Sequence, residues 1–298
     1  MSQAIIETSL PFHSFSDMRM QAGLRNEDPW HAFLALQFSL LRSRTTLLSN
    51  RHYGPLRVQR PFYQQENDQC HCYILHPPGG VVGGDRLCIE ITAGEATNVL
   101  LTTPGAGKFY RCPDKTGELI SRIRIKKDAR LDWLPQETLF FDDAHAKVNT
   151  EIYIEDNAAF VAWDIACLGR PAAGEVFRRG SIDQRFSIFN NDRRLFFDRT
   201  RIKDSLETLA GSWGWRHYTV NAILLANHID EELYAQCQSM NSITPQYMLA
   251  VTKLNDVLVV RYLGDSAEQA KNLLMSFVEK IKHDRDNEVF VKPRIWQT

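Results

Sequence analysis

A stretch rich in glycine and proline, residues 76–86, constrains the fold of this chain more than any other segment. It surrounds a single acid, Asp85, with two prolines and four glycines. Such a stretch cannot form the interior of a helix, because proline lacks a backbone donor and glycine loses much backbone entropy on folding. Its prolines also make it too stiff for a flexible linker. We therefore expect a tight, fixed turn between two strands that orients Asp85.

Alternating apolar residues predict strands on both sides of this turn. Leu34, Leu36 and Phe38 alternate with small or polar residues before it, and residues 87–91 repeat the pattern directly after it. A period of two packs one face of a strand and leaves the other in water. We expect residues 30–298 to form one mainly β domain, whereas residues 1–29 lack periodicity and are expected to be a poorly ordered extension.

A weak internal repeat bears on how the strands are arranged. Ile91, Ile125, Ile154 and Ile188 follow one another at steps of 34, 29 and 34 residues. This spacing suits strand pairs stacked on one another, each covering the apolar face of its neighbour. A plain antiparallel sandwich with regular hairpins would give a similar pattern, so the two architectures stay open on pattern alone.

The C-terminal part of the domain, residues 217–298, predicts a βαββα order. Its last helix is the clearest element, because Ser266 and Gln269 form a capping box. An apolar stripe follows the box at helical spacing and comprises Leu273, Leu274, Phe277, Val278 and Ile281. With a shorter helix expected at residues 231–240, we predict about two helices in an otherwise β-rich chain.

Charge and hydropathy exclude several classes of partner. The net charge is -1, so the chain lacks the basic excess that binding to nucleic acid or to an anionic membrane requires. Its apolar runs are too short to cross a bilayer, and its first residues lack the apolar block of a signal peptide. Six scattered cysteines do not form a disulfide framework. These features predict a cytoplasmic protein with free thiols.

The segment around Lys108 resembles a phosphate-binding loop without its essential parts. Gly105 and Gly107 precede the lysine, but a phosphate loop has Ser or Thr in the place of Phe109 and continues as a helix. We therefore expect that no nucleotide binds to this chain.

Four side chains that are close in the sequence are weak candidates for a soft metal site: Cys70, His71, Cys72 and His76. On a strand, the two cysteines share one face and His71 points to the other, which argues against a closed cage. No second pair of ligands is evident, so buried thiols in a core strand are the favoured interpretation. A transient contact with a transition metal stays open, since imidazole and thiolate both bind such ions.

The best functional candidates are Asp85, Asp164, Arg170 and Glu175. Asp164 lies in an otherwise apolar strand, where a carboxylate is costly unless it is hydrogen-bonded, paired or hydrated. Arg170, six residues later, is the expected ion-pair partner, and such a pair could be purely structural. Asp85 could likewise cap its own turn through neighbouring backbone donors.

The order and spacing of several long motifs resemble those of the urease accessory protein UreD family, called UreH in some organisms. Besides residues 76–86, the motifs are residues 54–63, 70–75, 102–111, 133–138, 167–175 and 293–296. The resemblance covers residues 30–298. It implies an elongated, mainly β protein in which antiparallel strands wind into a helix-like, solenoid-like stack with two helices.

This resemblance also implies a function. Members of the family are non-enzymatic factors that bind urease apoprotein and join UreF and the GTPase UreG, in an assembly made dimeric by UreF, to deliver nickel to urease. Nickel would be a transient ligand, and GTP would bind UreG instead of this chain. Asp85 and Asp164 match acids linked to an internal nickel tunnel in the family. Weaker matches are Thr102, Thr103, Arg170 and Glu175.

Candidate partner contacts are Lys108, Tyr110, Arg111 and Trp296. Tyrosine and arginine are favoured at interfaces, although strand packing explains the first three equally, and a tryptophan near a chain end usually docks back onto its own domain. Two other functions stay open. One is a carboxylate-based hydrolase, which needs two acids facing each other across a cleft. The other is a structural scaffold with dry, paired acids and no metal passage.

Overall fold

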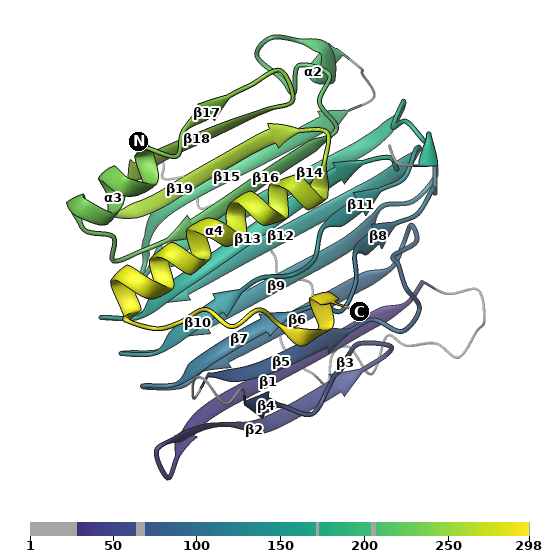
Figure 1. Ribbon diagram of the computed structural model, residues 1–298. Coiled ribbons are helices and arrows are strands. Elements are labelled where there is room, and N and C mark those ends of the chain that lie inside the picture. The colour runs from purple at the N-terminus through teal and green to yellow at the C-terminus, as the bar shows by residue number, and fades with distance from the viewer. Residues whose placement is uncertain (1–28, 64–68, 171–172, 204–206, 298) are drawn as a thin grey trace, which may run out of the picture.

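Two facing β-sheets form the body of the protein (Figure 1). The computed structural model describes residues 29–63, 69–170, 173–203 and 207–297, so the expected N-terminal extension lies almost wholly outside the described residues. The first sheet has the strand order β15 (Arg193–Lys203), β14 (Gly180–Asn190), β12 (Ala144–Ile154), β9 (Gly117–Ile125), β6 (Arg86–Ala93), β1 (His31–Leu41) and β2 (Arg44–Tyr53).

The second sheet has the order β17 (Ser242–Ile243), β18 (Tyr247–Leu254), β19 (Val257–Gly264), β16 (Val220–Ala226), β13 (Ala159–Leu168), β10 (Arg130–Trp133), β7 (Asn98–Thr102), β5 (Cys70–Leu75) and β3 (Arg57–Val58). Three short strands pair beside this path: β4 (Phe62–Tyr63), β8 (Gly107–Phe109) and β11 (Thr138–Phe140). Residues 76–86 were predicted to form a turn between two strands. This prediction is confirmed, because β5 ends at Leu75 and β6 begins at Arg86.

Successive strand pairs wind as the coils of a solenoid. β6 leads into β7, β9 into β10 and β12 into β13, so each coil contributes one strand to each sheet. Within each sheet these strands pair in parallel. The stacked arrangement predicted from the repeat is therefore confirmed, and the plain sandwich is excluded. Antiparallel pairing, which we expected for the stack, occurs outside these coils, for example between β14 and β15 and between β1 and β2.

The register of the coils differs slightly from the expected repeat. Ile125 pairs with Ile154, as the repeat predicts. Ile91, however, pairs with Ile123, two residues before its expected partner. Because side chains alternate across a strand, a shift of two residues keeps the same face inward. The turns between strands differ in length, so a pattern of inward isoleucines predicts the face of each strand better than its register.

Apolar side chains from both sheets fill the space between them. In β6, for example, Ile89, Ile91 and Ala93 are buried in this core, at the spacing of two that the sequence shows. Full burial of one such aliphatic side chain stabilises a fold by about 1.5–3 kcal/mol. The core between the sheets is therefore the main reason that the coils stack.

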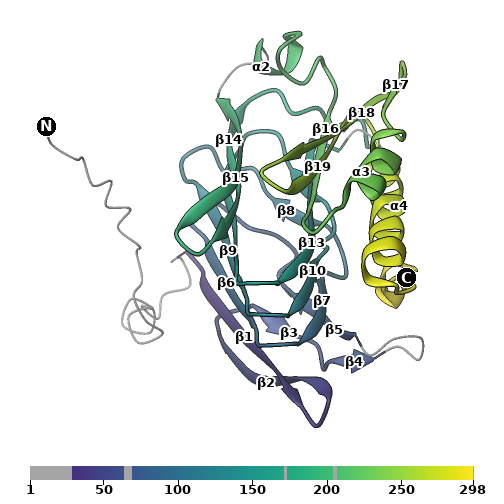
Figure 2. The ribbon, with the colours of Figure 1, turned by 90° about the vertical axis from the view of Figure 1, so that its left-hand side faces the viewer.

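The two longer helices, α3 (Glu231–Gln238) and α4 (Ala267–Asp286), lie on the outer side of the second sheet (Figure 2). The Ser266 hydroxyl oxygen accepts a 3.1 Å hydrogen bond from the Gln269 backbone, which confirms the predicted cap. The Gln269 side chain accepts a hydrogen bond from the Tyr262 hydroxyl instead of closing the box. The described helices also include α2 (Glu207–Ala210) and a 3-10 turn, η2 (Arg294–Gln297). None of the helices in the described part of the chain has the length and apolar character needed to cross a bilayer.

Candidate functional site

Four polar side chains interrupt the apolar space between the two sheets, and we call them the interior polar cluster: Asp164, Gln184, Asp198 and Arg261. Asp164 Oδ2 accepts a 2.7 Å hydrogen bond from Gln184 Nε2, which joins β13 of the second sheet to β14 of the first. Arg261 Nη2 lies 2.7 Å from Asp198 Oδ1 and joins β19 to β15 in the same way. Two side-chain bridges thus join the sheets: the first lies in the interior, and the second lies nearer the surface, since the Arg261 and Asp198 side chains are 46% and 26% exposed.

The alternation of side chains along β13 orients Asp164 inward. Ala162 and Ala166, which lie two residues to either side of it, belong to the core between the sheets. Trp163 and Ile165 belong instead to the cluster under helix α4. Asp164 as a whole residue is half-buried, with its carboxyl group between the two sheets.

Burial raises the pKa of Asp164 to about 6, well above its ordinary value of 3.8. The nearby charge of Asp198 raises this pKa as well, while the hydrogen bonds from Gln184 and from the Ile165 backbone lower it. The carboxyl group is therefore largely ionised at neutral pH and loses its charge in mild acid. An ionised carboxylate without an ion-pair partner can attract a divalent cation, and an oxygen ligand can release it again.

Sequence reasoning identified Asp164 but missed Gln184, Asp198 and Arg261. Each of the three occupies a position at which the alternation of its strand calls for an apolar residue. Gln184, for example, lies between the buried Ile182 and Phe186. The sequence signal that could have identified them is a polar residue at a position where the strand's alternation calls for an apolar one. This signal does not show which strands of the two sheets face each other, so the contacts could not be inferred from it.

The predicted ion pair between Asp164 and Arg170 is wrong. Arg170 lies 2.6 Å from Glu175, and its guanidinium group lies 4.7 Å from the centre of the Phe141 ring. The physical reason is that β13 ends at Leu168. Arg170 therefore belongs to the loop beyond the strand, whereas Asp164 lies in the middle of the strand and faces the interior.

Asp85 caps its own turn, as one of the two interpretations of the sequence predicted. Its Oδ1 accepts a 2.9 Å hydrogen bond from the Trp30 backbone, and its Oδ2 accepts one of 2.9 Å from the Val82 backbone. The side chain is buried, with 8% of its surface exposed. Both oxygens thus hold the turn against the start of β1, and Asp85 is not part of the interior polar cluster.

The two candidate threonines hold loops at the end of the second sheet. The Thr102 hydroxyl donates to the Leu134 carbonyl oxygen at 2.5 Å. The Thr103 hydroxyl oxygen accepts a 2.9 Å hydrogen bond from the Gln136 backbone. Of the six candidates for a nickel path, the structure therefore brings only Asp164 into the interior polar cluster.

The four candidate metal ligands do not converge. Cys70 and Cys72 are buried in the core between the sheets, while His71 lies on the opposite face of β5 beside the Phe62 ring, as the strand pattern predicted. Burial lowers the pKa of His71 to about 4, so this imidazole is neutral at physiological pH. Among the described residues, no group of three or more His, Cys, Asp or Glu side chains is arranged to hold a metal ion.

The candidate partner contacts have intramolecular roles. The Tyr110 ring packs edge-on against Phe141 at 5.0 Å, and Arg111 Nε lies 3.3 Å from Asp143. Lys108 lies in strand β8, and no helix follows it, which agrees with the absence of a phosphate loop.

Trp296 docks back onto its own domain, as expected for a tryptophan near a chain end. Its ring stacks on Trp163 with the centroids 5.5 Å apart. Its indole nitrogen also donates a 2.9 Å hydrogen bond to the Thr102 hydroxyl. The same contact fixes the C-terminal segment against the outer face of the second sheet.

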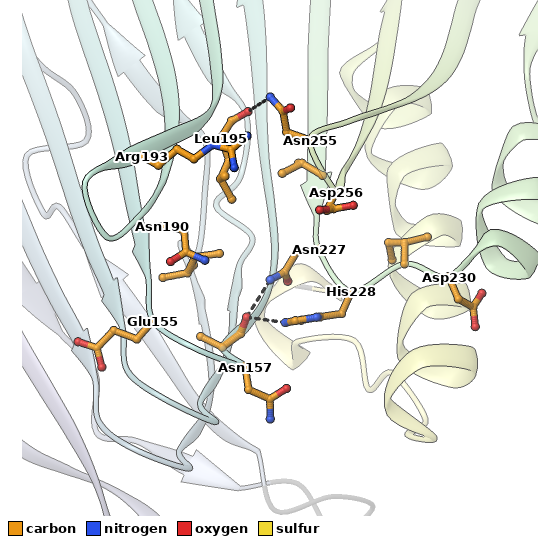
Figure 3. Close-up of a pocket in the computed structure, with 14 residues that line it drawn as sticks. Glu155, Asn157, Asn190, Arg193, Leu195, Asn227, His228, Asp230, Asn255 and Asp256 are labelled. Carbon is orange, nitrogen blue, oxygen red and sulfur yellow. Dashed lines mark hydrogen bonds between the residues drawn. The ribbon is translucent and has the colours of Figure 1, made fainter.

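A pocket of about 540 Å³ lies where the turns at one end of the two sheets meet (Figure 3). Its walls come from the β12–β13 turn, the β14–β15 and β18–β19 hairpins and the loop after β16. Asn227 spans two of these segments, since its Nδ2 donates to the Ala158 carbonyl oxygen at 2.8 Å and its Oδ1 accepts from the Phe160 backbone at 2.9 Å. The sequence pattern did not identify this pocket, because its residues come from four separate turns.

Comparison with known proteins gives a consistent result. A family model described as UreD urease accessory protein matches residues 31–297. The chain is similar to the urease accessory protein UreD of Alcanivorax borkumensis, with 39% identity over 90% of this chain and 92% of the relative. It is also similar to the proteins of the same name from a Marinomonas species, with 37% identity over 90% of each chain, and from Dechloromonas aromatica, with 36% identity over 90% of this chain and 95% of the relative.

Proposed function

The chain belongs to the UreD family of urease accessory proteins, and from that premise we propose that it acts without catalysis of its own, as a scaffold and conduit for nickel during urease maturation. It binds urease apoprotein together with UreF and UreG, in an assembly that is dimeric through UreF. UreG binds and hydrolyses GTP. Nickel is the cargo of this assembly and binds the chain only transiently.

The observation that supports a conduit is the position of Asp164. Its carboxyl group lies between the two sheets, is half-buried and, among the described residues, has no cationic partner. An isolated anionic oxygen in such a place attracts a divalent cation. Oxygen ligands bind nickel less tightly than thiolate or imidazole ligands do, so the ion can move on. Asp164 and Gln184 are the residues that we assign to the path.

We assign the opening of this path to the pocket at the turns. It borders the ends of β12, β14, β16 and β19, which are strands of both sheets (Figure 3). Amide and carboxyl groups surround it, including Asn190 and Asp256, whereas the Asn227 amide is already bound to the backbone on both sides. Such oxygen-rich walls suit a hydrated cation, because they can replace its water ligands one at a time.

The two alternative functions have less support. A carboxylate hydrolase needs two free acids that face each other, but both oxygens of Asp85 bind backbone donors and Glu175 is paired with Arg170, away from the interior polar cluster. A scaffold without metal passage would have dry, paired acids, whereas Asp164 is half-buried and not ion-paired within the described residues.

Reconstitution of urease maturation tests this proposal. Urease apoprotein is incubated with nickel, GTP, UreF and UreG, with and without this chain, and the nickel bound to urease is measured after removal of free metal. We expect nickel incorporation only when the chain is present, and no hydrolysis of urea or GTP by the chain alone. Equal incorporation without the chain would contradict a role in maturation.

A further inference from the structure

The outer face of the first sheet is a broad surface that no described helix covers. Both α3 and α4 lie beyond the second sheet (Figure 2). On β6, β9, β12, β14 and β15, strand register aligns the outward side chains in four rows of five, twenty in all. A stable protein–protein interface uses about 20–30 residues on each side, so this face alone is large enough for one.

This face carries an excess of positive charge, although the whole chain has a net charge of -1. Eight of the twenty outward residues are basic: Arg86, Arg122, Arg124, Lys147, Arg185, Arg194, Arg199 and Arg201. Four are acidic: Glu90, Glu118, Glu151 and Asp183. Each of these acids already pairs with a basic residue of the same face. The remaining positive charge is therefore available to an acidic partner.

Arginine and aromatic side chains gather in one part of this face, and we call them the arginine–aromatic strip: Arg124, Tyr153, Phe189, Arg194 and Phe197. Tyr153 and Phe189 stack with their centroids 4.9 Å apart. Arg124 lies 5.7 Å from the centre of the Tyr153 ring, and Arg194 lies 4.7 Å from that of Phe197.

The composition and exposure of the strip are those of an interface. Arginine and tyrosine are enriched among residues that dominate binding energy. Phe197 leaves 44% of its surface exposed. Among the described residues, neither Arg124 nor Arg194 forms an ion pair, so both guanidinium groups are held by aromatic rings and can still bind a carboxylate.

The strip borders the pocket at the turns. Phe189 precedes Asn190, and Arg194 follows Arg193, and both of these neighbours line the pocket (Figure 3). A protein docked on the strip would therefore lie next to this pocket. Under the proposed function, in which the ion leaves through the pocket, its recipient has to lie at this position.

We infer that the arginine–aromatic strip docks an acidic surface of urease apoprotein. This inference rests on the proposed function, because that function makes urease the recipient of the nickel. It adds a site to the function: a rigid, basic, aromatic strip on the helix-free sheet, beside the pocket. Acidic side chains of urease pair with Arg124 and Arg194, and an apolar group of urease covers Phe197.

Charge reversal tests the strip. The full chain, purified together with UreF, carries Arg124→Glu and Arg194→Glu, and its dissociation constant for urease apoprotein is measured by titration at two salt concentrations. We expect the dissociation constant to rise by at least about tenfold, with a weaker dependence on salt than for the wild type, because two steering charges are reversed. Binding of UreF and UreG should stay unchanged.

The matched control reverses two exposed arginines that lie away from this face, Arg60 and Arg216. Arg60 lies between the short strands β3 and β4, and Arg216 contacts Met248 of β18 in the second sheet. This control should bind urease as the wild type does, and thermal unfolding should show that both double variants are folded.

Three results would overturn the inference. The first is an unchanged affinity of the strip variant for urease. The second is an equal loss of affinity in the control. The third is a loss of UreF or UreG binding in place of urease binding, and each of these results would show that urease does not dock on the strip. If the wild-type chain did not bind urease apoprotein at all, the proposed function would fail as well, so the two failures are distinguishable.

Discussion

Asp164 on β13 and Gln184 on β14 join the two sheets by a 2.7 Å hydrogen bond across the interior of the solenoid. The strands that carry them belong to different sheets and are not neighbours in either. A contact of this kind needs space between the sheets that apolar side chains do not fill. It therefore marks a polar interruption of the apolar core between the two sheets.

The raised pKa of Asp164 makes a prediction about stability. Between about pH 4 and pH 6 the folded protein holds this proton more tightly than the unfolded chain does, so the free energy of unfolding falls as the pH rises through this window. Asp164→Asn stays neutral, and we expect its free energy of unfolding to rise relative to the wild type over the same window. Chemical denaturation at several pH values measures the difference. A difference that is independent of pH would contradict the assigned pKa.

A buried ion pair holds helix α4 to the second sheet. Lys282 Nζ lies 2.8 Å from Asp132 Oδ2, and the two side chains are 2% and 1% exposed. Lys282→Met leaves the Asp132 charge without this partner and should lower the free energy of unfolding by about 3–5 kcal/mol. Adding Asp132→Asn removes this stranded charge and should restore part of the loss, because Asp286 also loses Lys282 but keeps its pair with Arg285. Urea denaturation of the single and double variants tests this, and an unrestored double variant would argue against the ion pair as the cause.

The docked C-terminal segment depends on Trp296. The ring stacks on Trp163, and its nitrogen donates to Thr102. Trp296→Ala should lower the free energy of unfolding by about 3 kcal/mol, because a large ring and a hydrogen bond are lost together. Trp213, which is 77% exposed, is the control, and its replacement by Ala should change stability by less than about 0.5 kcal/mol. Similar effects of the two changes would show that Trp296 is not anchored as described.

Gly80 in the glycine-rich turn is closely packed, whereas Gly105 in another loop is open. A Cβ atom added at Gly80 would lie 2.3 Å from Tyr110 Cε2, while one added at Gly105, in a nearby loop, would have no neighbour within 4 Å. Gly80→Ala should therefore lower the free energy of unfolding by about 1–3 kcal/mol, and Gly105→Ala should leave it nearly unchanged. Thermal unfolding compares the two variants. Equal stability of both would mean that the Tyr110 ring moves aside freely.

Patterns of residues that are close together in the sequence predicted much of the fold. The alternation around Leu87 predicted β6, and Ser266 predicted the start of α4, because both signals lie within a few residues of the chain. The repeat predicted stacked coils, but it could not give the register of Ile91 with Ile123, which depends on turn lengths.

The site was harder to predict than the fold. Asp164 was recognisable as an acid in an apolar strand. Its partner Gln184 was not, because the contact depends on how two sheets face each other. The expected partner Arg170 was wrong for a related reason: six residues along a strand are far apart in space, and the strand ended between them. Distance along the sequence indicates ion pairs well in helices and poorly in sheets.

Nickel transfer by the Asp164→Asn variant tests the conduit most directly. The variant and an Asp114→Asn control, which makes the same change on an exposed loop, are compared at equal amounts of complex with UreF, UreG and urease apoprotein. We expect the nickel bound per urease to fall by about tenfold in Asp164→Asn, equivalent to 1.4 kcal/mol, and to stay at the wild-type level in the control. Equal nickel content in urease matured with the wild type, with Asp164→Asn and with the control would show that the ion does not pass Asp164.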